Sequence, residues 1–216
     1  MKLVVKIGGS ISISENGPIH EYFEKLLPFL DKLNRENQLI VCIGGGKFLR
    51  KYYESIRSFG LTDDQMEWIA IDLLKVNVRF LAFLLNMTPI YSLHELNEKS
   101  TGVIGGITPG RSTDANAAAA ASIIKADLFI KLTDVDGIYD SDPKKYHEAR
   151  LIKSIPFSEL SRYAEDGKPG HYGILDKLAI DTISRNQIKT ILINGSNPEN
   201  IFRVIKGEKL GTIIHH

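Results

Sequence analysis

The sequence predicts an α/β fold: a three-layer αβα sandwich with a mainly parallel central sheet, formed by one domain over residues 1–216. Two observations favour this class. Short apolar runs typical of buried strands alternate with segments that have the apolar spacing of helices. Glycine-rich or polar segments follow several of these strands directly. Because parallel strands gather their carboxyl ends at one edge of a sheet, we expect those segments to meet there.

The composition agrees with an ordinary globular protein. The chain is 43% hydrophobic and 25% charged, which excludes disordered and fibrous classes. Its formal net charge of +1 is too small to favour nucleic acid or an anionic membrane as partner. Cys42 is the single cysteine, so no intrachain disulfide can form. With no charged-then-apolar leader and no apolar run of roughly 18–20 residues, we expect a cytoplasmic protein.

The first half should contain two parallel strands, each followed by glycines. Residues 2–7 are rich in β-branched side chains and end at Gly8-Gly9-Ser10. After an amphipathic helix over residues 18–34, a second strand over residues 38–43 ends at Gly44-Gly45-Gly46. Glycine loops allow the backbone to approach a phosphate closely, although each loop alone is equally consistent with a tight turn.

Basic residues accompany both glycine loops. Lys6 lies inside a strand that should be buried on both faces, where an ammonium group is costly unless it finds an anion. Lys47 and Arg50 follow the second loop at the start of a helix. The recurrence of this pattern after two separate strands favours a shared crevice that binds an anion.

A long helix is expected over residues 65–85, followed by a strand over residues 88–91. The helix is apolar around much of its girth. Such a helix is usually covered both by its own sheet and by a neighbouring subunit, so the pattern predicts a homo-oligomer. The alternative is a helix buried wholly within one subunit.

The middle of the chain combines a helix start with a strand end. Residues 105–114 form a loop rich in Gly, Pro, Ser and Thr, and Ser112 or Thr113 is expected to cap an alanine-rich helix over residues 115–125. A buried strand over residues 128–132 then ends in a polar segment that begins at Thr133. A helix N-terminus beside polar side chains at a strand end is typical of a site for phosphorylated ligands.

The last third continues the alternation. We expect helices over residues 156–164, 176–186 and 198–206, and strands over residues 189–194 and 210–214. Residues 166–173 are predicted to form a mobile flap.

Taken in order, five motifs resemble the amino acid kinase superfamily, and more closely its archaeal uridylate (UMP) kinases. These motifs are KIGGS, GGG-x-x-x-R, TPGRSTDA, LTDVDGIYDSDPKK and KGEKLGT. The resemblance implies an αβα sandwich that transfers the γ-phosphoryl group of ATP to UMP. It also implies Mg²⁺ bound with ATP and no dedicated protein metal site, a homohexamer, and feedback inhibition by UTP.

The resemblance assigns residues to three roles. The catalytic residues would be Lys6, Arg50, Asp114 and Lys177, with Asp114 orienting Lys6. The ATP site would comprise Gly9, Ser10, Gly45, Gly46, Arg50, Thr133, Asp134, Tyr139 and Asp142. The UMP site would comprise Gly44, Asp64, Glu67, Thr108, Pro109, Gly110, Arg111, Ser112 and Thr113.

Three departures from the family pattern matter, and one is in the long helix, where relatives commonly carry an arginine before an asparagine and this chain has Lys75 before Asn77. Where relatives usually carry an aspartate against the UMP ribose, this chain has Glu67, with Asp63 and Asp64 nearby. Where archaeal relatives usually read Asp-Pro-Leu-Ala, it has Asp176 followed by Lys177. We predict that Lys177 is a second catalytic cation; the alternative is a solvated lysine without function in the first helical turn.

Other functions stay open on the sequence alone. The acceptor could be a carboxylate or an isoprenoid phosphate, or the chain could be a nucleotide sensor that has lost transfer activity. The pairing of Lys6 with Asp114 argues against a mere sensor, which would not need both residues.

Overall fold

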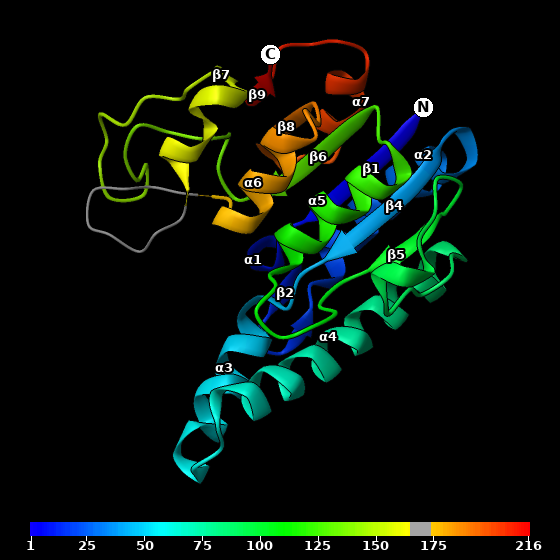
Figure 1. The fold of residues 1–216 in the computed structure, drawn as a ribbon, viewed down its shortest axis with the longest axis vertical. Coiled ribbons are helices and arrows are strands. Elements are labelled where there is room, and N and C mark those ends of the chain that lie inside the picture. Colours follow the sequence, from blue (N-terminus) through cyan, green and yellow to red (C-terminus); the bar gives the residue numbers. More distant parts are fainter. Residues whose placement is uncertain (165–173) are drawn as a thin grey trace.

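The computed structural model describes residues 1–164 and 174–216, and within them one seven-stranded sheet forms the centre of the molecule (Figure 1). The order across the sheet is β5-β4-β1-β6-β8-β9-β7. The strands are β1 (Lys2–Ile7), β4 (Gln38–Ile43), β5 (Gly102–Ile104), β6 (Leu128–Thr133), β7 (Ser154–Pro156), β8 (Thr190–Asn194) and β9 (Thr212–His215). All neighbouring pairs are parallel except β8 and β9, so the prediction of a mainly parallel sheet is confirmed.

Helices cover both faces of this sheet, which completes the predicted sandwich (Figure 1). One face packs against α2 (His20–Glu36), α4 (Asp63–Leu85) and α7 (Asn200–Ile205). The other face packs against α5 (Thr113–Ile124) and α6 (Lys177–Arg185). The remaining elements are α1 (Gly9–Ser12), α3 (Gly46–Ile56), the β2 (Ile13–Ser14) and β3 (Gly17–Pro18) hairpin, and the 3₁₀ helices η1 (Arg57–Phe59), η2 (Leu93–Glu95) and η3 (Phe157–Tyr163).

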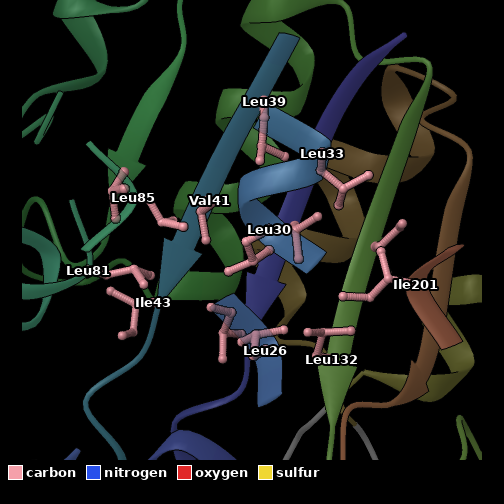
Figure 2. Packing of buried hydrophobic residues seen from close by; sticks show 14 of the residues in the cluster. Leu26, Leu30, Leu33, Leu39, Val41, Ile43, Leu81, Leu85, Leu132 and Ile201 are labelled. Carbon is pink, nitrogen blue, oxygen red and sulfur yellow. The ribbon is translucent and has the colours of Figure 1, made fainter. Parts of the chain in front are cut away.

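The hydrophobic core follows from the alternation of side chains along the strands. Successive residues of a strand point to opposite faces, so Leu3 and Val5 join one cluster while Val4 joins the other. Figure 2 shows the first cluster, in which leucines of α2 and α4 and Ile201 of α7 meet the aliphatic side chains of β4 and β6. The second cluster is built largely from the small alanines of α5, which let that helix lie close to the sheet.

Two expectations about individual elements are wrong. Residues 88–91 do not form a strand. Only Pro89 bridges to Val103, through the Val103 N–H to the Thr88 carbonyl and the Ile90 N–H to the Val103 carbonyl, and the ladder ends there because β5 is three residues long. Residues 157–163 form the 3₁₀ helix η3 and not an α-helix. The expected flap at residues 166–173 lies outside the described residues. Along the two described ranges, no helix combines the length and the apolar character needed to cross a bilayer.

Candidate active site

Two buried lysines and one aspartate meet at the centre of the sheet. Lys6 of β1 and Lys131 of β6 are register partners on adjacent parallel strands, and they are only 5% and 4% exposed. Asp114, in the first turn of α5, lies over both. Its Oδ2 is 3.2 Å from Lys6 Nζ and 2.8 Å from Lys131 Nζ. We call these three residues the cation cluster.

The cation cluster has a net charge of +1 and keeps its carboxylate ionised. Burial raises the pKa of Asp114, but Lys131 and Lys6 lower it by more, so the pKa lies below its ordinary value. A buried excess of positive charge is stable only if an anion or further dipoles compensate it. Lys131 also donates to the carbonyl of Ile174, which supplies one such dipole. The cluster is therefore suited to bind an anionic ligand.

Lys131 was missed by the sequence analysis, although the necessary signal was present. It lies in the middle of a six-residue strand, Leu128–Thr133, whose residues are all buried. The argument that singled out Lys6, an ammonium group inside a buried strand, applies equally to Lys131.

The two glycine loops touch each other beside the cation cluster. A side chain on Gly9 would place its Cβ 2.3 Å from the backbone N of Gly46. Gly46 itself has φ +62, and a Cβ there would lie 2.5 Å from the Gly9 carbonyl oxygen. These glycines are needed because the backbones of α1 and α3 approach closely at this point. The expected convergence of the two loops on one edge of the sheet is thus observed.

A pocket of about 280 Å³ opens on the α4 side of this edge. It is lined by the loop that precedes α5 and by α4: Glu67, Ala70, Ile71, Leu74, Gly106, Thr108, Pro109, Gly110, Arg111 and Ser112. Glu67 Oε2 accepts a hydrogen bond of 2.6 Å from the Gly110 N–H, so this carboxylate belongs to the pocket. Asp64, the other candidate, is exposed and does not line it.

The loop before α5 is held by its own polar side chains. Ser112 is the N-cap, and its Oγ accepts from the Ala115 N–H at 2.9 Å and donates to Asp176, the N-cap of α6. Asn116, fully buried and not singled out by the sequence, accepts from Arg111 Nε and donates to the Gly105 carbonyl. This loop is therefore fixed to both helices that cover this face. The structure selects Ser112 over Thr113 as the cap.

A second group of predicted residues lies in the segment that follows β6, residues 134–145, which we call the donor segment. Asp134 forms an ion pair with Lys144, and Asp142 accepts from the Lys144 N–H at 3.0 Å and lies 3.6 Å from Lys145 Nζ. Burial raises the pKa of Asp134, but the hydrogen bond and charge of Lys144, together with bonds from the Asp134 backbone and Thr133, lower the pKa by more. Tyr139 donates to Asp136 at 3.3 Å. Asp134 and Asp142 are thus paired with nearby lysines at the surface, whereas Asp136 accepts from Tyr139 and Asn194.

Some predicted residues are not drawn into these contacts. Ser10, Arg50 and Lys177 are exposed. Lys177 nevertheless lies next to the site, because it directly follows Asp176, which bonds to Ser112. Thr133 is buried at the end of β6 and donates to Asp134 at 3.3 Å.

The part of the chain that the structure describes contains no group of three or more His, Cys, Asp or Glu side chains placed to hold a metal ion. The carboxylate nearest the centre, Asp114, is already engaged by two lysines. A divalent cation at this site would therefore have to be held mainly by the ligand's own oxygens and by water.

Comparison with known proteins gives one consistent result. A model of the amino acid kinase family matches residues 1–93 and 56–194. The uridylate kinase of Methanobrevibacter smithii is 38% identical over 222 residues, covering 98% of both chains, and that of Methanothermobacter thermautotrophicus is 38% identical over 224 residues, covering 99% of both. The crystal structure of uridylate kinase from Archaeoglobus fulgidus superposes with a TM-score of 0.86 at 33% identity, covering 99% of this chain and 100% of that one.

Proposed function

The chain belongs to the amino acid kinase family, and we propose that it transfers the γ-phosphoryl group of ATP to the phosphate of UMP, giving UDP and ADP. The observation that carries this proposal is the buried cation cluster of Lys6, Asp114 and Lys131. Asp114 follows Ser112 of the pocket by two residues, and Lys131 lies three residues before the donor segment. Full-length similarity to uridylate kinases supports UMP as the acceptor.

The reaction requires the protein to bring two phosphates together. A phosphate oxygen of UMP attacks the γ-phosphorus, the bond from that phosphorus to the β–γ bridging oxygen breaks, and ADP leaves with the electron pair. The acceptor oxygen is already deprotonated at neutral pH, so no base is needed. Lys6 and Lys131 offset the negative charge of the transferring group. Asp114 holds both ammonium groups in position and does not itself accept a proton.

We assign the two nucleotides to opposite sides of the cation cluster. UMP would occupy the pocket beside α4, with Glu67 at its ribose and the loop of Thr108–Thr113 around its phosphate. ATP would lie along the donor segment, with Asp134, Tyr139 and Asp142 at its base and ribose. The glycine loops would supply N–H groups to the phosphates between them, and Arg50 would swing in from the surface.

Magnesium would enter as the complex with ATP. Its chemistry would be to neutralise the charge of the phosphates, and the lining residues fit this role because they leave the metal to phosphate oxygens and water. We also propose Lys177 as a further cation beyond Lys6 and Lys131, since it lies in the first turn of α6 beside the N-cap bonded to Ser112.

The assembly and its regulation extend the proposal. Helix α4 exposes Trp68, Val76, Phe83 and Leu84, and we propose that other copies of the chain cover them in a homohexamer. We further propose a cytoplasmic enzyme inhibited by UTP. Sedimentation of the purified chain tests the hexamer, and a monomer at micromolar concentration would contradict it. Steady-state rates with added UTP test the inhibition.

A coupled assay of ADP release tests the function itself. The protein is mixed with MgATP and, separately, with UMP, CMP, glutamate and isopentenyl phosphate. We expect rapid ADP release with UMP. Release only with glutamate or isopentenyl phosphate would replace UMP by that acceptor, and no release with any of them would favour a nucleotide sensor.

A further inference from the structure

The last motif of the chain, KGEKLGT, has no role in the site described so far, although it closes the sequence pattern. It ends at Thr212, the first residue of β9, whose side chain is fully buried. A buried hydroxyl needs hydrogen-bond partners, so the partners of Thr212 indicate what the motif does.

The hydroxyl of Thr212 joins three parts of the chain: the donor segment at Ile138, the segment at Ile152, and β9, to which Thr212 belongs. Its Oγ1 accepts from the Ile138 N–H at 2.8 Å and donates to the Ile152 carbonyl at 2.6 Å. Ile152 in turn donates from its N–H to the Ile138 carbonyl at 2.8 Å. Thr212 therefore completes a closed set of three hydrogen bonds in the middle of the donor segment.

The backbone around Thr212 leaves no room for a different arrangement. A Cβ on Gly137 would lie 2.5 Å from Thr212 Oγ1, so the donor segment lies directly against the threonine. Gly211 has φ +68, and a Cβ there would lie 1.9 Å from the Leu192 carbonyl oxygen. The Gly-Thr pair is thus required for β9 to begin at this point and to present its hydroxyl to Ile138.

Residues on both sides of Ile138 carry the proposed ATP contacts. Asp134 lies four residues before Ile138, and Tyr139 and Asp142 follow it. The pairing of Tyr139 with Leu151 and of Asp140 with Arg150 extends the same junction. A shift of Ile138 would therefore displace these side chains together, while the acceptor pocket beside α4 would stay in place.

We propose that Thr212 is a positioning residue for the ATP site, acting through the hydrogen bond that holds Ile138. It touches neither nucleotide and acts by fixing the donor segment relative to the cation cluster. This inference rests on the proposed function, because it identifies the ligand of the donor segment as ATP.

Steady-state kinetics and nucleotide binding of the full-length Thr212→Val variant test the proposal. Valine keeps the shape of threonine but leaves the Ile138 N–H and the Ile152 carbonyl without their partner. We expect the KM and the Kd for ATP to rise about tenfold, because the loss of the one buried hydrogen bond that holds Ile138 corresponds to about a tenfold change in affinity. The KM for UMP should change less than about twofold, and Thr212→Ser should restore the ATP values.

Thr190→Val is the matched control. Thr190 is also fully buried, and its Oγ1 donates to the Ile188 carbonyl at 2.8 Å. It is the first residue of β8, and this hydrogen bond does not involve the donor segment. We expect it to lower the melting temperature without a selective change in the KM for ATP. If Thr212→Val raises the KM for both nucleotides equally, or changes neither, the proposal is wrong.

Gly137→Ala decides the matter if Thr212→Val does not fold. It disturbs the same junction from the donor segment, and we expect the same selective loss of ATP affinity; an equal loss for both nucleotides would overturn the proposal. Binding of ATP to the wild type separates this inference from the function. A wild type that binds ATP but does not phosphorylate UMP refutes the proposed function. The role of Thr212 can then still be tested by comparing the Kd for ATP of the wild type and of Thr212→Val.

Discussion

The cation cluster and the donor segment both carry charged side chains, but they hold them in opposite ways. In the cluster, Lys6 and Lys131 are almost fully buried on two central strands and share one carboxylate. In the donor segment, Lys144 and Lys145 pair with Asp134 and Asp142 at the surface, and the lysine side chains are 59% and 75% exposed.

This difference indicates how the two regions meet a nucleotide. The buried charges cannot find water or new partners, so their arrangement must be ready before the phosphate arrives. The surface charges are solvated and can exchange partners at little cost. We infer that the cluster determines the rate of transfer, while the donor segment mainly determines the affinity for ATP.

The largest effect is expected from Asp114→Asn. Removing this charge leaves two buried ammonium groups without a counter-ion, which destabilises a fold by about 3–5 kcal/mol. We also expect kcat to fall by about 10²–10³-fold, because the two lysines lose their fixed positions. Thermal unfolding and steady-state kinetics at saturating ATP and UMP measure both changes.

Asp181→Asn serves as its control, since Asp181 is an exposed carboxylate on α6. It should leave the melting temperature and kcat nearly unchanged. If Asp114→Asn retained the wild-type kcat in a folded protein, the cation cluster would not determine the rate, and the contrast between the two regions would fail.

The next largest effect is expected from Lys131→Met, which keeps the length of the side chain but removes its charge. The lost ammonium group acts mainly on the charge that develops during transfer, so kcat should fall by about 100-fold with little change in either KM. A rise in KM at constant kcat would instead show that Lys131 only binds the ground state.

The pH dependence of stability gives a third test of the cluster. The pKa of Asp114 is lowered in the folded protein, so its ionisation stabilises the fold above the pKa of the unfolded chain, which is about 3.9. That contribution is lost as the pH falls from there through the lower folded-state pKa. Lys131→Met removes the leading cause of the lowering. The gap in melting temperature between wild type and Lys131→Met should therefore be largest near pH 7 and narrow below about pH 4.

The sequence could predict features that depend on local pattern. The parallel sheet, the glycine loops and the burial of Lys6 all follow from residues that are neighbours in the chain. The burial of Lys131 could have been predicted in the same way as that of Lys6, because both lie inside buried strands. Thr88–Tyr91 was mistaken for a strand because its apolar character does not reveal that the neighbouring strand β5 is three residues long and leaves room for a single bridge.

Features that join distant segments could not be predicted without the resemblance. The bond from Ser112 to Asp176 links residues 64 positions apart, and that from Thr212 to Ile138 links residues 74 positions apart. Each is a single polar contact between segments that the sheet order brings together, and no periodicity encodes it. The choice of Glu67 over Asp64 could not be made from the sequence either, because it depends on which side of α4 faces the loop that contains Gly110.

A smaller effect is expected from Lys177→Ala. If Lys177 is a further cation for the transferring group, kcat should fall about tenfold, less than for Lys131, because an exposed charge is screened by water. Steady-state kinetics measure it. Unchanged kcat and KM would remove Lys177 from the site and leave it as a solvated lysine of α6.

The smallest effect is expected from Lys144→Ala in the donor segment. Its ion pair with Asp134 is at the surface, so stability should change by less than about 1 kcal/mol. Because Asp134 must leave this partner to bind ATP, the KM for ATP should fall, by no more than about fivefold, with kcat unchanged. Arg35→Ala is the control, since it removes a surface pair with Asp31 near the C-terminus of α2. A large drop in kcat for Lys144→Ala would mean that the donor segment also determines the rate, and the division between the two regions would have to be abandoned.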